Sequence, residues 1–376
     1  MKKKRIILYC DCWKNGGIES YLMSQVRHWN LSEMDCVILS AEKGNDAYDS
    51  ELREYGISQI VLLDKSYPPV LRTLRTFKKM KQFLREQPCD VIYYNLANSV
   101  GLRYAKIAKK AGVNRRIVHS HSAGIQPSLT RKAKLLAHIL AKKLYTQYAT
   151  DWWTCSDQAG QFLFDPCIEQ YIQYIPNAIE TKKFSFNMTA RNQIRQKIGI
   201  GEDVILLGTV GRFVTQKNQS FLFDVIAALC ERGINIKLLL VGNGPLHSEL
   251  QKRAMELGLN DCCIFWGQVD NTAPLYCAID IFCLPSLLEG NPISAMEAQT
   301  AGCICLLADT ITKQAAITNN VLFLQLKCDV WCQRVLETCQ KKNSIKERIS
   351  AAQAMRNAGM DIKCVAEKVQ SLICEK

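Results

Sequence analysis

Short apolar runs alternate with longer segments of helical periodicity along the first half of the chain. The runs, each bounded by polar or turn residues, are Ile6–Cys10, Cys36–Leu39, Ile60–Leu63, Val91–Tyr94 and Arg116–Val118. After the first run, apolar residues recur every three or four positions, at Ile18, Leu22, Val26 and Trp29. This alternation of strand and helix patterns predicts a parallel sheet covered by helices.

The second half repeats this pattern with other segments. Its apolar runs, typical of buried parallel strands, are Val204–Val210, Ile236–Val241, Cys262–Phe265, Ile281–Leu284 and Ile304–Leu307. Segments with helical spacing separate them, among them Phe221–Cys230, Leu246–Leu257 and Pro292–Ala301. We therefore predict an α/β protein with two Rossmann-like sheets in tandem, which hold a ligand near the carboxyl ends of their strands.

The expected domain boundary follows the turn at Tyr174–Asn177. Residues 1–177 then form a first Rossmann-like domain and residues 178–345 a second. The remaining segment, 346–376, has a mostly helical pattern, and packing back on the first domain is one alternative for it. A length of 376 residues fits two domains of this kind.

Composition bears on the cellular compartment. The basic start Lys2–Arg5 is followed by only five apolar residues before Asp11, so we do not expect a signal peptide. No stretch free of Asp, Glu, Lys and Arg reaches the about 18 to 20 residues that a membrane-spanning helix needs. The 18 cysteines include no CxxC pair, which favours buried reduced thiols over a zinc site or a disulfide scaffold. We therefore expect a cytoplasmic protein.

Positive charge is concentrated in the first half. The formal net charge is +13, with 26 Lys and Arg against 16 Asp and Glu in residues 1–177 (net +10), and 22 against 19 in residues 178–376 (net +3). The excess lies in three helix-like segments: Arg72, Arg75, Lys78, Lys79, Lys81 and Arg85; Arg103, Lys106, Lys109 and Lys110, continuing to Arg115 and Arg116; and Arg131, Lys132, Lys134, Lys142 and Lys143. Either these are solvated faces, or they meet anionic lipid or a phosphorylated substrate. No recognition-helix, zinc-finger or RNP pattern supports a nucleic-acid partner.

Two short motifs follow predicted strands in the first half. Gly16 and Gly17 would let the backbone approach a ligand closely, and the helix after them offers free N–H groups to an anion; a simple turn is the alternative. His119 and His121 follow the fifth apolar run, where a histidine can contact a substrate or merely pack. If the strand continued through both, we would expect their rings to face opposite ways.

A glycine-ended strand in the second half precedes two cations. The run Gly208–Gly211 leads into Arg212 and, five residues later, Lys217. At the carboxyl end of a parallel strand, a guanidinium and an ammonium group can converge on a diphosphate. Two cations would stabilise the negative charge on a departing nucleoside diphosphate. Ordinary surface charge is the alternative.

Two further strand ends are candidates for nucleotide contacts. Asn243 and Gly244 belong to a strand–glycine–helix junction whose backbone would wall a pocket, although a structural turn is equally consistent. Gln268 and Val269 follow another predicted strand, and their backbone would read the edge of a base.

The segment Pro285–Ala298 carries the most specific pattern. Asn291 suits a helix N-cap and Pro292 the first helical position, which places Glu289 in the preceding loop and Glu297 about a turn and a half inside the helix. Glu289 would accept hydrogen bonds from sugar hydroxyls and Glu297 from ribose hydroxyls. The apolar surroundings of Glu297 argue against two unrelated surface glutamates.

Several of these motifs, taken in order, resemble one known family. They are Gly16-Gly17-Ile-Glu19, Ile175-Pro-Asn177, Val210-Gly-Arg212 with Gln216-Lys217, Gly242-Asn-Gly244-Pro, and Glu289-x7-Glu297-Ala with Ala301-Gly302. Together they resemble the retaining, family-4-like glycosyltransferases of the GT-B fold that carry an EX7E motif. His119-Ser-His121 and Glu289-Gly-Asn-Pro look most like the bacterial capsular or exopolysaccharide branch.

The resemblance implies roles for individual residues of the second half. Arg212 and Lys217 would bind the donor diphosphate, Glu297 the ribose, and Glu289 would lie near the donor sugar. The backbone N–H groups of Gly290 and Asn291 would reach the same sugar.

One departure from the family and two first-half roles complete this comparison. Pro292 stands where many members have glycine, and it has no N–H to give. His121 would lie on the acceptor side near the anomeric carbon, and Gly17, with Gly16 before it, would approach the phosphate or the donor sugar.

The resemblance also implies a fold and an activity. We expect two Rossmann-like domains facing across a cleft, the first binding the acceptor and the second the donor. The activity would be hexosyl transfer with retention, from a UDP- or GDP-sugar to a lipid-linked oligosaccharide, in capsular or exopolysaccharide biosynthesis at the inner face of the cell membrane. No DxD triplet is present, so we expect no metal. The alternatives are another GT-B enzyme, such as a nucleotide-sugar epimerase, and a nonenzymatic sugar-nucleotide-binding subunit.

Overall fold

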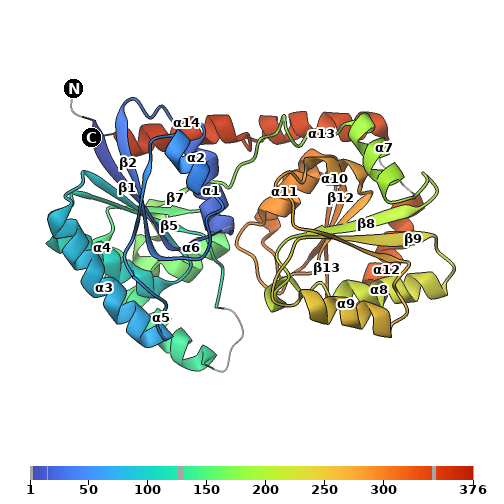
Figure 1. The fold of residues 1–376 in the computed structure, drawn as a ribbon, viewed down its shortest axis with the longest axis horizontal. Helices are drawn as coiled ribbons and strands as arrows, with labels where there is room; N and C mark the ends of the chain where they lie inside the picture. Colours follow the sequence, from blue (N-terminus) through green and yellow to red (C-terminus); the bar gives the residue numbers. More distant parts are fainter. Residues whose placement is uncertain (1–2, 15, 126–129, 341–343, 376) are drawn as a thin grey trace. The chain divides into compact units, whose positions relative to one another are not determined.

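A computed structural model describes residues 3–14, 16–125, 130–340 and 344–375. Lys2 of the basic start therefore lies outside the described residues. The chain divides into two compact units (Figure 1). The N-terminal unit combines Met1–Asn177 with Ile362–Lys376, and the C-terminal unit comprises Ala178–Asp361.

The N-terminal unit is built on a seven-stranded parallel sheet with the order β3-β2-β1-β4-β5-β6-β7. The strands are β1 (Lys4–Trp13), β2 (Met34–Lys43), β3 (Ser58–Val61), β4 (Val91–Leu96), β5 (Arg115–Ser120), β6 (Asp151–Thr154) and β7 (Ile172–Tyr174). The helices are α1 (Gly17–Val26), α2 (Asp49–Glu54), α3 (Pro69–Glu86), α4 (Arg103–Lys110), α5 (Arg131–Tyr145), α6 (Asp157–Leu163) and α14 (Ile362–Cys374), with 3-10 turns η1 (Ser99–Leu102), η2 (Thr146–Tyr148) and η3 (Pro166–Tyr171).

Both faces of this sheet are covered. Ile7 and Tyr9 of β1 pack with Met80 of α3 and Ala105 of α4 in one core. In Figure 1, α3, α4 and α5 lie along this side of the sheet. The alternate β1 residues, such as Leu8, are equally buried, as period-two alternation in a doubly covered strand requires.

The C-terminal unit contains a six-stranded parallel sheet with the order β10-β9-β8-β11-β12-β13. Its strands are β8 (Ile205–Val210), β9 (Ile236–Val241), β10 (Cys263–Gly267), β11 (Ile281–Leu284), β12 (Ile304–Ala308) and β13 (Val321–Leu324). The helices are α7 (Met188–Lys197), α8 (Phe221–Glu231), α9 (His247–Glu256), α10 (Ala273–Ala278), α11 (Ile293–Thr300), α12 (Cys328–Gln340) and α13 (Ile345–Asn357), with 3-10 turns η4 (Thr215–Lys217) and η5 (Lys313–Ala315). One core lies against α10 and α11, and another against α8, α9 and α12.

All ten predicted strands are present, and the expected fold class is confirmed as two parallel-sheet, Rossmann-like units. The pattern missed β6, β7 and β13, which have only three or four residues each. Short strands at or next to a sheet edge carry too few residues for a clear period.

The expected end of the second domain at residue 345 is wrong, because α13 belongs to the C-terminal unit. Gly302 has φ +69, and a Cβ there would lie 2.4 Å from the Cα of Arg348 in α13. The missing side chain lets α13 pack directly on the turn between α11 and β12. Arg348 is buried, and its guanidinium donates to the carbonyls of Ala301 (3.1 Å) and Tyr276 (3.0 Å).

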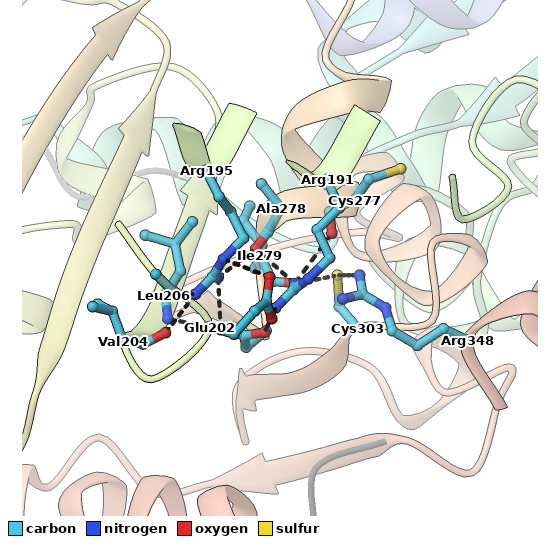
Figure 2. Close-up of polar contacts among 12 residues, drawn as sticks. Arg191, Arg195, Glu202, Val204, Leu206, Cys277, Ala278, Ile279, Cys303 and Arg348 are labelled. Carbon is cyan, nitrogen blue, oxygen red and sulfur yellow. Dashed lines mark hydrogen bonds and ion pairs between the residues drawn. The ribbon is translucent and has the colours of Figure 1, made fainter. Parts of the chain in front are cut away.

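A charged cluster, which we call the Asp280 cluster, ties α7 to the start of β11 (Figure 2); its two arginines are buried, whereas its Glu202 is exposed. It comprises Arg191 and Arg195 of α7 with Asp280 and Glu202. The Arg191 Nη2 and Arg195 Nη1 atoms lie 2.9 and 3.1 Å from the two carboxylate oxygens of Asp280. Arg195 Nη2 donates to the carbonyls of Gly201 and Val204, and Asp280 also accepts from the N–H of Leu206 at 2.9 Å.

Of the helices that follow the C-terminal sheet, α12 and α13 belong to the C-terminal unit and α14 belongs to the N-terminal unit. Within that unit α14 packs on α1, and the indole of Trp29 donates to the carbonyl of Ala366 at 3.1 Å. Lys4 and Arg115 donate to carbonyls in the last turn of α14, where the helix dipole favours positive charge. The helix therefore completes one side of this unit.

Part of the basic surplus serves the fold itself. Arg115 pairs with Asp151 at 2.7 Å, and Arg72 pairs with Glu42 at 2.8 Å. The buried Arg116 donates to three backbone carbonyls. These cations of the first two basic segments are thus not available to a partner.

No helix in the described part of the chain is long and apolar enough to cross a membrane. All 18 cysteines are free thiols, and only Cys167 and Cys364 are exposed.

Candidate active site

The loops after β8 and β9, at the carboxyl end of the C-terminal sheet, are joined by backbone hydrogen bonds. The N–H of Gly211 donates to Val241 at 3.0 Å, and the N–H of Phe213 donates to Asn243 at 2.9 Å. A Cβ at Gly242 would lie 2.1 Å from the carbonyl oxygen of Gly211, and one at Gly244 2.3 Å from that of Phe213. The two glycines after β9 are therefore required for the close approach of these loops.

Lys217 and Glu289 meet at this edge of the sheet. Lys217 Nζ lies 2.7 Å from Glu289 Oε1, and the side chains are 19% and 11% exposed. Lys217 also lies over Gly211, whose added Cβ would be 3.5 Å from Lys217 Cε. Arg212, five residues before Lys217, has an exposed side chain. The structure thus brings a cation and a carboxylate together, and it leaves Arg212, the residue after Gly211, exposed to solvent.

The loop that carries Glu289 is fixed by η4. The N–H of Leu287 donates to the carbonyl of Gln216 at 2.8 Å, and the Gln216 amide donates to Leu288. Asn218 adopts a left-handed conformation with φ 53 and donates from its side chain to the carbonyl of Pro285 at 3.1 Å. These bonds explain how Lys217 and Glu289, 72 residues apart, are held in register.

The α11 helix starts one residue later than the sequence suggested. Pro292 is its N-cap, with φ −74 and ψ 113, and Asn291 precedes it. The proline ring fixes φ but leaves ψ free, so an extended Pro292 begins the helix at Ile293. Glu289, Gly290 and Asn291 are all buried immediately before it.

Glu297 lies in α11 and has a partner that the sequence did not indicate. The hydroxyl of Tyr276 donates to Glu297 Oε2 at 2.7 Å. Burial raises the pKa of the Glu297 carboxyl to about 7, while the Tyr276 hydrogen bond and the charge of Lys183 oppose this rise. The tyrosine belongs to a different helix, 21 residues earlier, so no sequence spacing links it to Glu297.

The remaining predicted residues of this unit border the same loops. Asn243 accepts from the N–H of Gly244 at 2.7 Å and lies 2.9 Å from the ring of His247, another residue that the sequence did not single out. Gln268 is exposed, and Val269 packs on the core. Both follow Gly267, whose carbonyl accepts from the N–H of Gly242 at 2.8 Å.

In the N-terminal unit, Gly16 and Gly17 form the junction between β1 and α1. Gly16 is the N-cap of α1, and a Cβ there would lie 2.4 Å from Glu19 Oε2, whereas a Cβ at Gly17 would meet open space. Burial raises the pKa of Glu19 to about 7. The junction therefore places the buried carboxyl of Glu19 beside the two glycines. Glu19 belongs to the sequence motif, but the sequence assigned it no role.

His121 follows β5 and is held by Asn95. Its Nε2 lies 2.8 Å from Asn95 Oδ1, and its backbone N–H donates to Leu96 at 3.1 Å. The Asn95 amide nitrogen faces the carbonyls of Tyr9 and Tyr93 at 3.4 Å, so its oxygen accepts from His121 Nε2–H. Burial lowers the pKa of His121 to about 3, so the ring is neutral and its Nδ1 is unprotonated.

The expectation that His119 and His121 face opposite ways is wrong. Their ring centroids lie 4.1 Å apart. β5 ends at Ser120, and even in a continuing strand residues two positions apart would share a face. His119 is buried, and its Nδ1 lies 2.6 Å from the hydroxyl of Tyr93, which in turn lies 3.0 Å from that of Tyr21. His119 therefore belongs to a buried network, and His121 lies at its end.

The candidate sites can now be compared with known proteins. Residues 190–352 match the family model described as glycosyl transferases group 1. The putative glycosyltransferase EpsF of Bacillus subtilis (strain 168) is 28% identical over 371 residues, which are 95% of this chain and 95% of that protein. The UDP-Gal:alpha-D-GlcNAc-diphosphoundecaprenol alpha-1,3-galactosyltransferase of Escherichia coli is 22% identical over 323 residues, covering 81% of this chain and 79% of that protein.

Solved structures show the same fold over nearly the whole chain. HepE of Anabaena, in complex with UDP and glucose, superposes with a TM-score of 0.77 at 18% identity, covering 99% of both chains. The sucrose-phosphate synthase of Thermosynechococcus elongatus gives a TM-score of 0.79 at 16% identity, covering 98% of both. Residues 190–352 are therefore similar to the group 1 glycosyl transferases. The chain as a whole is similar to EpsF and has the fold of these solved structures, with two parallel-sheet, Rossmann-like units.

Proposed function

We propose that the protein is a retaining hexosyltransferase that moves a sugar from a nucleotide diphosphate sugar to a hydroxyl of a lipid-linked oligosaccharide, in capsular or exopolysaccharide assembly. The observation that carries this proposal is the Lys217–Glu289 pair at 2.7 Å, beside the close backbone approach at Gly211 and the exposed Arg212. The Escherichia coli relative, whose name gives a UDP-galactose donor and a diphosphoundecaprenol acceptor, supports this substrate class.

In this proposal Lys217 and Arg212 act on the leaving group. When the bond between the anomeric carbon and the diphosphate oxygen breaks, negative charge develops on the diphosphate. Two positioned cations stabilise that charge more strongly than they stabilise the intact donor, which lowers the barrier. Glu289 holds the Lys217 ammonium in place and borders the donor sugar.

The other residues of the C-terminal unit hold the donor. Glu297 accepts from the ribose hydroxyls, and the Tyr276 hydroxyl fixes the direction of its carboxyl. The backbone of Gln268 and Val269 meets the base, and Asn243 and Gly244 wall the nucleotide.

In this proposal backbone groups contact the donor sugar. Gly290 and Asn291 offer N–H groups beside the start of α11, whereas Pro292 has none. His121, Gly16 and Gly17 serve the acceptor side and the anomeric carbon. Because His121 is neutral and its Nε2–H donates to Asn95, its Nδ1 accepts a hydrogen bond without adding charge.

The reaction is proposed to need no metal ion. Within the part of the chain that the structure describes, no group of three or more His, Cys, Asp or Glu side chains is arranged to hold one. Arg212 and Lys217 supply the positive charge that a metal would otherwise bring to the diphosphate. We also propose that the protein works at the inner face of the cell membrane as a peripheral protein, because its acceptor is lipid-linked.

A donor screen followed by a transfer assay tests the proposal. Purified protein is heated with UDP, GDP and their sugars, and a ligand that binds the folded state raises the melting temperature. The stabilising donor is then incubated with and without a lipid-linked saccharide, in the presence and absence of EDTA. We expect transfer that needs the acceptor and survives EDTA, with the anomeric configuration of the donor kept in the product.

Other outcomes of this assay contradict the proposal in distinct ways. Conversion of the donor without an acceptor would indicate an epimerase. Nucleotide binding without transfer or hydrolysis across a broad acceptor panel would indicate a nonenzymatic subunit, and loss of transfer in EDTA would contradict metal independence.

A further inference from the structure

Helix α5 exposes a contiguous apolar face. Its five large apolar side chains point to solvent with exposed fractions of 45% to 60%: Leu135, Leu136, Ile139, Leu140 and Leu144. They recur at helical spacing, and only His138 and Ala141 of this helix are buried. Scattered exposed leucines are ordinary, but five on one 15-residue helix form a patch that implies a partner.

Polar contacts on its other side anchor α5. His138 Nδ1 accepts from the N–H of Ser99 at 3.1 Å, and its Nε2 lies 3.0 Å from the carbonyl of Phe162. Lys142 donates to the carbonyl of Gln161 at 2.5 Å. The apolar face is thus presented outward by a helix that is fixed to its unit.

The charge on α5 identifies the kind of partner. The helix contains the basic residues Arg131, Lys132, Lys134, Lys142 and Lys143 and no acidic residue. The neighbouring α4 also contains no acidic residue. A second copy of this chain would bring like charges together across an α5–α5 contact, whereas an anionic lipid surface complements them.

We propose that α5 docks the N-terminal unit on an anionic bilayer, with its apolar face among the acyl chains and its basic residues at headgroup level. At about 1.5 Å per residue the helix is roughly 22 Å long, so it lies in the plane of the interface and does not cross the membrane. Lys132 near its start and Lys143 near its end flank the apolar residues, where long cationic side chains reach the headgroups. This inference rests on the proposed function, whose acceptor is lipid-linked, and deepens it by naming the surface.

Three sets of substitutions separate the apolar and the charged contributions. The apolar variant is L136Q/I139Q/L140Q, and the charge variant is K132Q/K143Q. The matched control is M255Q/L257Q/I349Q, which changes apolar side chains in the C-terminal unit that are 60%, 42% and 59% exposed. All are exposed positions, so folding should be preserved and is checked by the melting temperature.

Co-sedimentation with vesicles at low and high salt gives the readout. We expect the wild type and the control to bind phosphatidylglycerol vesicles at least about tenfold more tightly than phosphatidylcholine vesicles at low salt. The apolar variant should lose about tenfold or more in affinity for phosphatidylglycerol vesicles, and the charge variant should lose most of the preference between lipids. Unchanged binding by the apolar variant, or no vesicle binding by the wild type, would overturn the proposal. So would self-association of the wild type that the apolar variant abolishes, because the face would then join two copies.

Donor binding keeps this test independent of the proposed function. The apolar variant should retain the rise in melting temperature with the nucleotide sugar that stabilises the wild type. If no nucleotide stabilises any variant while vesicle binding follows the pattern above, the proposed function fails and the docking surface stands.

Discussion

The C-terminal unit contains two charged clusters that differ in how completely their groups are paired. In the Asp280 cluster, Arg191, Arg195 and Asp280 meet one another and backbone groups from several elements. At the other end of the sheet, Lys217 meets Glu289, and Arg212 extends into solvent. Burial alone does not separate them, since Asp280 and Glu289 side chains are 12% and 11% exposed.

The difference teaches how to tell a structural cluster from a binding site. A buried arginine whose donors meet carboxylates and carbonyls has little left to offer a ligand, and its loss leaves other charges uncompensated. A cation with one carboxylate partner can still bind a diphosphate, and neighbouring glycines let the ligand approach the backbone closely. Disrupting the Asp280 cluster should therefore mainly lower stability, whereas disrupting the Lys217–Glu289 pair should mainly lower activity.

The largest expected effect is on stability, from Asp280→Ala. It leaves the buried guanidinium groups of Arg191 and Arg195 without their shared carboxylate, so we expect unfolding free energy to fall by about 3–5 kcal/mol. Chemical denaturation of the wild type and the variant measures it. The control is Asp224→Ala, which removes a half-exposed pair with Arg253 and should cost below about 1 kcal/mol. Equal losses in the two variants would contradict the comparison.

Lys217→Ala should affect activity instead. Removing one of two cations from the leaving diphosphate is expected to lower kcat/KM of sugar transfer roughly 10²–10³-fold. The loss of stability should be smaller than in Asp280→Ala, because only one buried charge, that of Glu289, loses a partner. Steady-state kinetics measure the loss of activity, and Arg212→Ala should act in the same direction. Lys252→Ala, at a side chain that is 72% exposed, is the matched control and should leave kcat/KM unchanged. Near-normal turnover in both Lys217→Ala and Arg212→Ala would contradict the proposal that these residues bind the leaving diphosphate.

Glu297 should make donor binding depend on pH. Its pKa of about 7 lies above the ordinary value of 4.5, so the folded protein keeps a proton that the unfolded chain has released between these pH values. Its contribution to stability therefore falls as pH rises through that window. Only the ionised carboxylate accepts two ribose hydroxyls, so the donor should bind more tightly above about pH 7.

Titration calorimetry of wild type and Glu297→Gln isolates this dependence. Binding by the variant should be weaker and flat over the same range. Glu19 in the N-terminal unit also has a pKa of about 7. If donor binding by Glu297→Gln still depended on pH, the titrating group would be one other than Glu297.

The smallest expected effect concerns Asn95, which pairs one nitrogen of His121 and leaves the other open. Asn95→Leu removes the acceptor of Nε2–H, so both neutral tautomers should become populated. Nitrogen NMR of the imidazole signals measures this directly. Losing one hydrogen bond of about 1 kcal/mol should lower transfer by at most about tenfold. Asn95→Asp retains an acceptor and should keep the wild-type tautomer; a single tautomer in Asn95→Leu would contradict the role.

The apolar pattern was sufficient to predict the fold class. Ten of the strands and the division into two α/β halves follow from runs of buried residues, because parallel strands covered on both faces must be apolar along their length. The boundary after residue 345 was wrong because the attachment of α13 depends on Gly302 meeting Arg348, a contact between distant positions.

The candidate site was predictable where its residues lie in a motif. Glu289, Lys217 and Arg212 belong to loops after glycine-rich or proline-rich strand ends, which leave a local signal. Tyr276 and Asn95 left none, because each acts through a side-chain contact across 21 or 26 residues.

The sequence by itself determined the alternation of strands and helices, the glycines that admit close backbone approach, and the uneven distribution of charge. Only the tertiary structure decided which charges pair within the fold and which are exposed. Arg72, Arg115 and Arg116 pair within the fold, whereas Lys132 and Lys143 of α5 are exposed, together with the leucines of this helix. The physical reason is that periodicity records which face of an element is apolar, while packing decides whether another element covers that face.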